Sequence, residues 1–412
     1  MSLPTLADVQ RWDAEDGLRS FRSRFDLPEG VIYLDGNSLG ALPRAIGPRL
    51  AAAISQEWGQ DLIRSWNSAD WIGAPQRIGG KIARLIGARP HEVIAADSTS
   101  VNLFKLLMAG LADRPGRRVI LTEPGNFPTD LYVAQGVAAL LPEVEIRIAP
   151  RDRIVEAIDE TVAVVMLTHV HYKTGERFDM AAVTRAAQAK GALMLWDLSH
   201  SAGAVAVDLN ACGADLAIGC GYKYLNGGPG APAFLFVAER HQGRLTSPLT
   251  GWMGHAAPFD FGDQYAAGEG VKRFLCGTPP ILGLTALEVG VDLFLEADLA
   301  LVIRKSQRLC SLFIDLVEGR CSNQGLTLAT PRDPGLRGSH VSFGHDHGYP
   351  VMQALIARGV IGDFRAPDIL RFGFTPLYVG YEDVWNAVEI LRGILAGGSW
   401  DSEAYKVRSA VT

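Results

Sequence analysis

Short apolar runs alternate with longer amphipathic segments between about residues 90 and 240. The runs are rich in β-branched residues and predict strands at 92–97, 117–123, 145–150, 162–170, 192–200, 214–220 and 231–238. The segments between them repeat their apolar positions at helical spacing and predict helices at 101–112, from Thr129, at 153–160 and at 180–191, the last capped by Gly191. Continuously apolar strands separated by helices predict βαβ units and a mainly parallel sheet with helices on both faces.

The pattern changes after about residue 280. Long helical periodicity covers 281–297 and 299–319, shorter strands follow near 340–345 and 369–378, and a final helix is expected at 381–397. These changes predict three parts: an N-terminal arm and helix at 1–50 that pack with the small domain, a large α/β domain at 51–285, and a smaller C-terminal α+β domain at 286–412.

Composition narrows the class of protein. The chain has 412 residues, of which 48% are hydrophobic and 20% charged, so global disorder is excluded. A net charge of −6 argues against a nucleic-acid surface, and five scattered cysteines without a C-x-x-C pair argue against a disulfide framework or a zinc cluster. The N-terminus lacks the apolar core of a signal peptide, and no apolar run approaches the ~20 residues of a membrane span. We therefore expect a cytoplasmic protein without nucleic-acid or membrane partners.

Polar side chains stand at three predicted strand ends, where open parallel sheets bind ligands. Asp97-Ser98-Thr99-Ser100 precedes a helix, and its hydroxyls favour helix capping, although they would also suit an anion. Asp197, near His200, is either a capping residue or a buried carboxylate that requires a cation. Lys223 lies between two tyrosines, where a lysine either extends to solvent or becomes a nucleophile in a desolvated pocket.

Together the three sites suit pyridoxal 5'-phosphate (PLP). This cofactor needs a lysine for its aldehyde, a carboxylate for its pyridinium nitrogen and a phosphate pocket at a helix N-terminus. Asp197 precedes Lys223 by 26 residues (223 − 197), which suits neighbouring strands. Neither a G-x-G-x-x-G motif nor a P-loop is present, so a nucleotide is not the obvious anion.

Six segments together carry a resemblance to a known family. They are GNSLG (36–40), NFPTD (126–130), WDLSH (196–200), GYKYLNGG (221–228), GWMGH (251–255) and FLCGTPPIL (274–282). Between about residues 30 and 390 their order and spacing resemble kynureninase of the bacterial type, in the aspartate aminotransferase superfamily. The resemblance implies a type I PLP-dependent transferase fold. It also implies hydrolysis of L-kynurenine to anthranilate and L-alanine, with 3-hydroxykynurenine as the poorer substrate, in tryptophan catabolism or NAD biosynthesis.

The same resemblance implies roles for individual residues. Lys223 would bind PLP and later move the substrate's α-proton, Asp197 would hold the pyridinium nitrogen, and Tyr222 would move protons near the substrate carbonyl. The further cofactor contacts would be Thr99, Ser100, Phe127, Pro128, Thr129, Asp130, Thr168 and His200, with Tyr222 also at the phosphate. Trp252 and Thr278 would reach the phosphate of the neighbouring subunit, so a homodimer with shared active sites is implied.

Substrate contacts follow from the same likeness. Arg371 would bind the α-carboxylate, for which a planar guanidinium is well suited. Trp66 would stack on the aryl ring, and Asn37 and Ser38 would line the same pocket. Animal members carry Asn where this chain has Thr278, so Thr278 with Trp66 indicates a preference for kynurenine over 3-hydroxykynurenine. No metal is expected, although H-x-H pairs occur at 169–171 and 345–347.

Three alternatives are open to test. A cysteine desulfurase would need a nucleophilic cysteine such as Cys321, but its surroundings in EGRCSNQG favour an ordinary loop residue. An aminotransferase would share Lys223 and Asp197 but not the segments at 36–40, 251–255 and 274–282. A silent ligand-binding module of a regulator would carry a basic DNA-binding domain, for which this acidic chain has no room.

Overall fold

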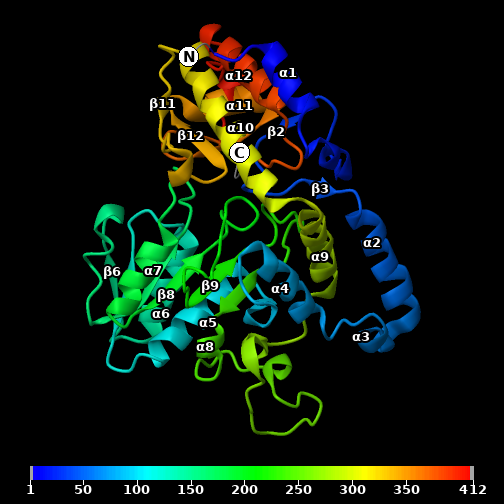
Figure 1. The fold of residues 1–412 in the computed structure, drawn as a ribbon, viewed down its shortest axis with the longest axis vertical. Coiled ribbons are helices and arrows are strands. Elements are labelled where there is room, and N and C mark those ends of the chain that lie inside the picture. Colours follow the sequence, from blue (N-terminus) through cyan, green and yellow to red (C-terminus); the bar gives the residue numbers. More distant parts are fainter. Residues whose placement is uncertain (1–2, 409–412) are drawn as a thin grey trace.

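A seven-stranded sheet forms the centre of the larger part of the molecule (Figure 1). The computed structural model describes residues 3–408. The sheet order is β4-β10-β9-β8-β7-β5-β6, and only β10 runs antiparallel to its two neighbours. The strands are β4 (Val93–Ala95), β5 (Val119–Thr122), β6 (Glu145–Ile148), β7 (Val162–Thr168), β8 (Leu193–Asp197), β9 (Leu216–Gly219) and β10 (Phe234–Val237). The predicted mainly parallel sheet is confirmed.

Both faces of this sheet are buried, as the continuously apolar strands predict. In β8, Leu195 packs on one face with α5 and α6, whereas Trp196 packs on the other face with α4, α7 and α9. The helices of this part are α2 (Ile46–Ala52), α3 (Ser65–Ser68), α4 (Ala74–Leu85), α5 (Thr99–Ala112), α6 (Pro128–Leu140), α7 (Met180–Ala189), α8 (Glu239–Gln242) and α9 (Ile281–Glu296), with a π-helix at Ala53–Asp61. Gly191, with φ of 77°, follows α7 as the predicted cap.

A second sheet lies in the smaller part, which is at the top of Figure 1. Its antiparallel order is β11-β12-β15-β14, and β2 pairs separately with β13. The strands are β11 (Thr327–Leu328), β12 (His340–Gly344), β13 (Val360–Ile361), β14 (Asp363–Arg365), β15 (Ile369–Gly373) and β2 (Ile32–Tyr33), besides the antiparallel pair of β1 (Phe25–Asp26) and β3 (Leu42–Pro43). The helices are α1 (Leu6–Ala14), α10 (Leu299–Arg320), α11 (Gly348–Ile356), α12 (Tyr381–Ala396) and α13 (Glu403–Lys406), and α1 packs on α12.

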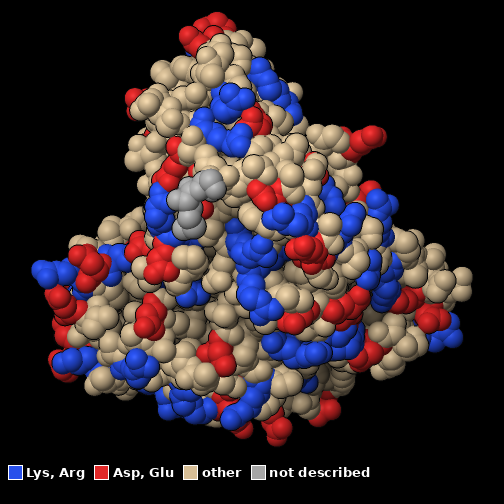
Figure 2. Space-filling model, turned by 45° about the horizontal axis from the view of Figure 1, so that its top comes forward, with Lys and Arg blue, Asp and Glu red and all other residues tan. Residues whose placement is uncertain are grey.

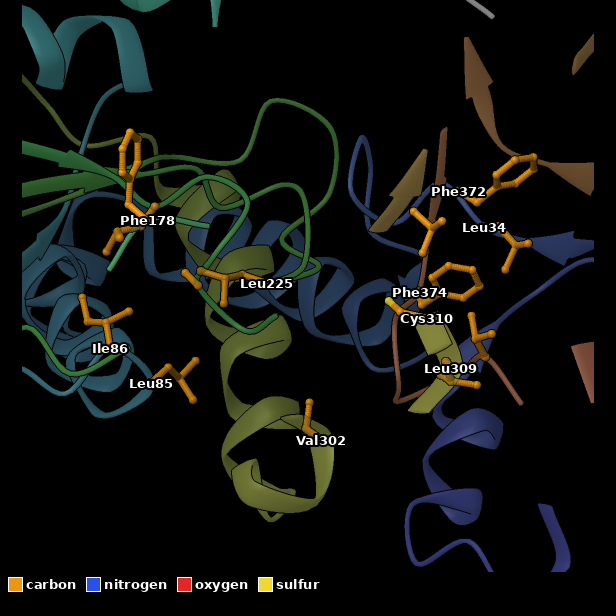
Figure 3. Packing of buried hydrophobic residues seen from close by; sticks show 14 of the residues in the cluster. Leu34, Leu85, Ile86, Phe178, Leu225, Val302, Leu309, Cys310, Phe372 and Phe374 are labelled. Carbon is orange, nitrogen blue, oxygen red and sulfur yellow. The ribbon is translucent and has the colours of Figure 1, made fainter. Parts of the chain in front are cut away.

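One apolar core joins the two parts. Figure 3 shows Phe178 and Leu225 of the larger part in the same cluster as Leu34, Phe372 and Phe374 of the smaller part. The predicted domain boundary at residue 285 falls inside α9, and the three-part division stays a prediction. No described helix, within residues 3–408, is long and apolar enough to cross a bilayer. Figure 2 shows basic and acidic side chains interspersed on one face.

One predicted helix is wrong. Residues 153–160 do not form a helix. A short 3-10 turn at Arg151–Arg153 is followed by further turns. The apolar spacing that suggested a helix arises because Ile154 and Ile158 are both buried. Side-chain hydrogen bonds fix the turns instead: Arg147 donates to the carbonyl of Ala157 and to the carboxylate of Asp159.

Helix α4 lies against β4 at a glycine. A Cβ atom on Gly79 would come within 2.3 Å of the Val93 carbonyl oxygen, so Gly79→Ala must push the helix away from the sheet. We expect it to lower the free energy of unfolding by about 1–3 kcal/mol, the usual cost of overpacking. Gly136→Ala in α6, where a Cβ would meet no atom within 4 Å, is the matched control and should be neutral or stabilising. Thermal unfolding of both variants measures this; equal transitions would contradict the close packing.

Candidate active site

A cavity of about 660 Å³ opens at the carboxyl ends of the central strands. The parallel register aligns Thr168 with Asp197, and Asp197 with Ile218, so the residues that end β7 and β8 lie side by side. The structure brings ten of the residues proposed from the sequence to this cavity. They are Thr99, Ser100, Phe127, Thr129, Asp130, Thr168, Asp197, His200, Tyr222 and Lys223.

Lys223 lies in a desolvated position in the turn after β9. Its side chain points into the cavity and the residue is only 8% exposed. The ammonium nitrogen is 2.9 Å from Nε2 of His200 and lies 5.6 Å from the centre of the Phe127 ring. The backbone is held on both sides, since the amide of Gly40 donates to the Tyr222 carbonyl and that of Asn226 to the Lys223 carbonyl. This amine is therefore fixed and shielded from water.

Two buried carboxyl groups share the cavity. Asp197 accepts a 2.7 Å hydrogen bond from the amide of Ser199, and Asp130 accepts one from the Thr168 hydroxyl at 3.2 Å. Burial raises the pKa of both carboxyls, and the charge of Asp197 raises that of Asp130 further. Oδ1 of Asp130 has no hydrogen-bond partner within the described part of the chain. A cation bound here would stabilise the ionised form of a carboxyl that the chain alone leaves poorly compensated.

His200 is a neutral imidazole. Burial lowers its pKa, and the nearby positive charge of Lys223 lowers it further. Nε2 of this ring is within hydrogen-bond distance of the Lys223 nitrogen, so Nδ1 is the ring atom left for another partner. That Nδ1 atom is buried and lacks a hydrogen-bond partner among residues 3–408.

The start of α5 forms the remaining wall of the cavity. Ser98 caps the helix, since its hydroxyl accepts from the amide of Val101 at 3.4 Å, so the predicted capping role is confirmed for this residue. Thr99 and Ser100 occupy the first helical turn and line the cavity. Amide donors at a helix N-terminus, with adjacent hydroxyls, suit an anion.

Arg371 does not line the cavity but lies behind it, on β15. It is 2% exposed, and its Nε donates to Oδ1 of Asp363 at 2.8 Å, while a second, shorter bond joins Nη2 to Oδ2. Nη2 also donates to the hydroxyl of Ser38, and Nη1 donates to the carbonyl of Tyr172. The ring of Tyr172 lines the cavity and contacts Phe127 edge to face, so one residue separates the guanidinium from the cavity.

Several predicted residues lie elsewhere in this chain. Asn37 is fully buried near Gly373, and neither polar atom of its side chain has a hydrogen-bond partner in the described chain. Trp66 packs edge-on against Trp71, and Pro128 begins α6 without lining the cavity. Trp252 and Thr278 are exposed and do not line the cavity of this chain.

The two histidines of the H-x-H pair at 169–171 have different surroundings. His169 is buried against the hydroxyl of Ser201, and burial lowers its pKa to about 3. His171 contacts the Gly125 carbonyl instead. Within residues 3–408 no group of three His, Cys, Asp or Glu side chains is placed to bind a metal ion.

Two acidic neighbours of Arg371 were not predicted from the sequence. Asp363 accepts from Arg371 and Arg365, and Asp35 lies close enough for the charge of Asp363, added to burial, to raise the Asp35 pKa to about 7. The short strand that carries Asp363 was not predicted. The alternation of acidic and basic residues at Asp363, Arg365, Asp368 and Arg371 is a local signal of ion pairing, but it does not say which of them pair.

The fold defines the class of this protein. A cysteine desulfurase of Thermococcus onnurineus superposes with a TM-score of 0.77 at 20% identity, covering 96% of this chain and 99% of the other. A C-DES variant with glycine covalently linked to its PLP cofactor gives the same TM-score at 16% identity, covering 90% and 98%. Residues 73–219 match the DegT/DnrJ/EryC1/StrS aminotransferase family. These likenesses establish the type I fold of PLP-dependent enzymes, which confirms the predicted fold class.

Full-length relatives identify the family within this class. The chain is 54% identical to kynureninase of Burkholderia mallei and 53% identical to kynureninase of Pseudomonas fluorescens, each over 100% of both chains. Residues 302–391 match the kynureninase C-terminal domain. The chain therefore belongs to the kynureninase family of PLP-dependent enzymes. The family, the enzyme class and the cofactor expected from the sequence are confirmed.

Proposed function

We propose that this enzyme hydrolyses L-kynurenine to anthranilate and L-alanine, with the reaction centred on Lys223. One observation supports this most directly: a desolvated lysine amine and a buried Asp197 carboxyl share one cavity in a chain that is 54% identical to kynureninases along its whole length. We place the reaction in the cytoplasm and in tryptophan catabolism.

The residues of the cavity fit PLP. Lys223 would bind the aldehyde, and Asp197, whose pKa is raised by burial, would gain the cationic partner it lacks at the pyridinium nitrogen. Phe127 and His200 would flank the ring. Thr99, Ser100 and Tyr222 would hold the phosphate, with Pro128, Thr129, Asp130 and Thr168 nearby. When bound, the cofactor supplies an electron sink for carbanions at the substrate's α- and β-carbons.

Proton movement would fall to side chains of this chain. Lys223 would accept the substrate's α-proton once its amine is free. The amine is suited to this role because it lies inside the cavity, among Phe127, Tyr222 and His200. Burial raises the pKa of Tyr222, so its phenol stays protonated and would donate to the substrate's γ-carbonyl oxygen as water adds. The Cβ–Cγ bond would then break to give the two products.

Arg371 would bind the substrate's α-carboxylate from the small domain. Asp363, Ser38 and the Tyr172 carbonyl accept four of its five N–H groups, so the guanidinium is held rigidly. Tyr172 connects this arginine to the cavity through the Phe127 ring. Asn37, Ser38 and Trp66 would complete the substrate side.

A homodimer would supply the rest of the site. Trp252 is 42% exposed and Phe261 74% exposed, and the two rings stack 6.2 Å apart on a loop outside the cavity. Exposed aromatic side chains that cluster in this way are typical of interaction surfaces. We propose that this loop and Thr278 meet the cofactor phosphate of a second copy.

A desulfurase reaction is disfavoured by Cys321. This cysteine is 3% exposed, ends α10 within the apolar core, and burial raises its pKa to about 11. A thiol that is shielded and protonated cannot serve as a mobile nucleophile. Keto-acid formation, measured beside anthranilate release, separates an aminotransferase from the proposed hydrolase.

Lys223→Ala should abolish the visible absorbance of the lysine-bound cofactor and lower kynurenine turnover by at least about a thousandfold, since the nucleophile and the proton carrier are lost together. An absorbance scan followed by anthranilate fluorescence after addition of L-kynurenine measures both. Lys190→Ala, a surface lysine paired with Glu160, is the control and should behave as the unaltered enzyme. Normal turnover by the Lys223 variant would refute its assignment.

Arg371→Lys should raise the KM for L-kynurenine by about tenfold or more, because an ammonium cannot reproduce the planar guanidinium that Asp363, Ser38 and the Tyr172 carbonyl hold in place. The affinity for PLP should not change, since Arg371 lies outside the cavity lining. Arg365→Lys, at a neighbouring and more exposed partner of Asp363, is the matched control and should leave KM within about twofold. An unchanged KM in the Arg371 variant would remove it from substrate binding.

We expect a higher kcat/KM for L-kynurenine than for 3-hydroxykynurenine, as Thr278 with Trp66 indicates. The ratio should fall in Thr278→Asn, which introduces the residue found in animal members. Steady-state rates with both substrates test this at one pH. Equal or reversed values in the unaltered enzyme would contradict the preference.

A further inference from the structure

A lysine in the middle of α5, the helix that begins at Thr99, is fully buried. The side chain of Lys105 in α5 has 0% exposure, and its ammonium donates to Oδ2 of Asp97 at 2.5 Å and to the Phe274 carbonyl at 2.6 Å. Removing a charge from water is costly, so a buried ammonium persists only where it is paired and hydrogen-bonded. The role of Lys105 therefore depends on its two hydrogen-bond partners, Asp97 and the Phe274 carbonyl.

Asp97 connects this lysine to the cavity. It lines the cavity wall, directly precedes the helix cap Ser98, and has a positive φ of 50°. Side-chain-bearing residues seldom adopt that conformation, although Asp and Asn tolerate it best. The Asp97 carbonyl accepts a hydrogen bond from the amide of Ala233, so the ion pair and this bond fix the turn that leads into Thr99 and Ser100.

The negative charge of Asp97 would weaken the binding of an anion at the start of α5. A carboxylate beside Thr99 and Ser100 would repel the phosphate dianion proposed to bind there. Lys105 compensates this charge from the side of Asp97 that faces the protein interior. With the charge of Asp97 compensated, the amides of the first helical turn would attract an anion without opposition from this carboxylate.

The second partner joins the loop to another part of the proposed site. The Phe274 carbonyl belongs to the segment that continues to Thr278, four residues later, for which a role at the partner's phosphate is proposed. One buried ammonium thus fixes both the phosphate loop of its own chain and the base of this exposed segment.

We propose that Lys105 is a positioning residue for the cofactor phosphate: it holds Asp97 in place and neutralises its charge without touching the ligand. This inference rests on the proposed placement of the phosphate at Thr99 and Ser100. It concerns binding of the phosphate alone, because neither Lys105 nor Asp97 is placed at the pyridine ring or at Lys223.

The experiment compares PLP with pyridoxal, which has the same ring and aldehyde but no phosphate. Both are titrated into the full-length chain after removal of its cofactor, and visible absorbance gives the two dissociation constants. Lys105→Met, which has a similar length but no charge, should reduce the preference for PLP over pyridoxal at least tenfold. The double variant Asp97→Asn with Lys105→Met should recover most of this preference, because the uncompensated carboxylate is gone.

Other outcomes distinguish a wrong role for Lys105 from a wrong placement of the phosphate at Thr99 and Ser100. Equal weakening of both ligands, an unchanged preference, or no recovery in the double variant would overturn the role of Lys105. If Lys105→Met does not fold, Asp97→Asn alone decides, since it leaves Lys105 uncompensated and should increase the preference for PLP; a decrease overturns the inference. Ser100→Ala is the control for placement, and if it leaves the preference unchanged, the proposed phosphate site itself is wrong.

Discussion

The register of three parallel strands determines what this molecule can do. Because β7, β8 and β9 are paired so that Thr168 faces Asp197 and Asp197 faces Ile218, their polar ends meet at one edge of the sheet. A shift of one residue would turn Asp197 towards the opposite face and into the packing of Trp196. The apolar cores on both faces hold this register, so the geometry of the cavity depends on packing far from it.

The edge brings together two buried carboxyl groups whose charges Lys223 offsets only in part, since burial still raises the pKa of both Asp130 and Asp197. His200 is neutral, and its Nδ1 atom is buried without a hydrogen-bond partner in the described chain. Burying such groups is costly, and the cationic ring of PLP would compensate the carboxyl groups here. The same principle, applied to Asp97, explains a lysine buried in the middle of an apolar helix.

The sequence predicted local features well, namely the strands and the polar residues that follow them. Apolar runs mark the strands, and the polar residue after each run marks the cavity, so Asp197, Lys223 and Thr99 could be found without a structure. The predicted helix at 153–160 was wrong because the buried pair Ile154 and Ile158 imitates helical spacing. The partnership of Arg371 with Asp363 could not be predicted, since antiparallel pairing of β14 with β15 creates it. Family resemblance, rather than pattern, supplied Trp66, Trp252 and Thr278.

The small domain contributes rigidity as well as a charge. Arg371 is already paired with the nearest acid, and this pair fixes the orientation of its side chain. Asp363 occupies the Nε edge of the guanidinium, and Ser38 and the Tyr172 carbonyl accept from its two Nη atoms. The acid that would otherwise compete with substrate therefore orients the arginine. Burial and the charge of Asp363 raise the pKa of Asp35 to about 7, so Asp35 is about half ionised at neutral pH and carries less negative charge beside the arginine than an ordinary carboxylate would.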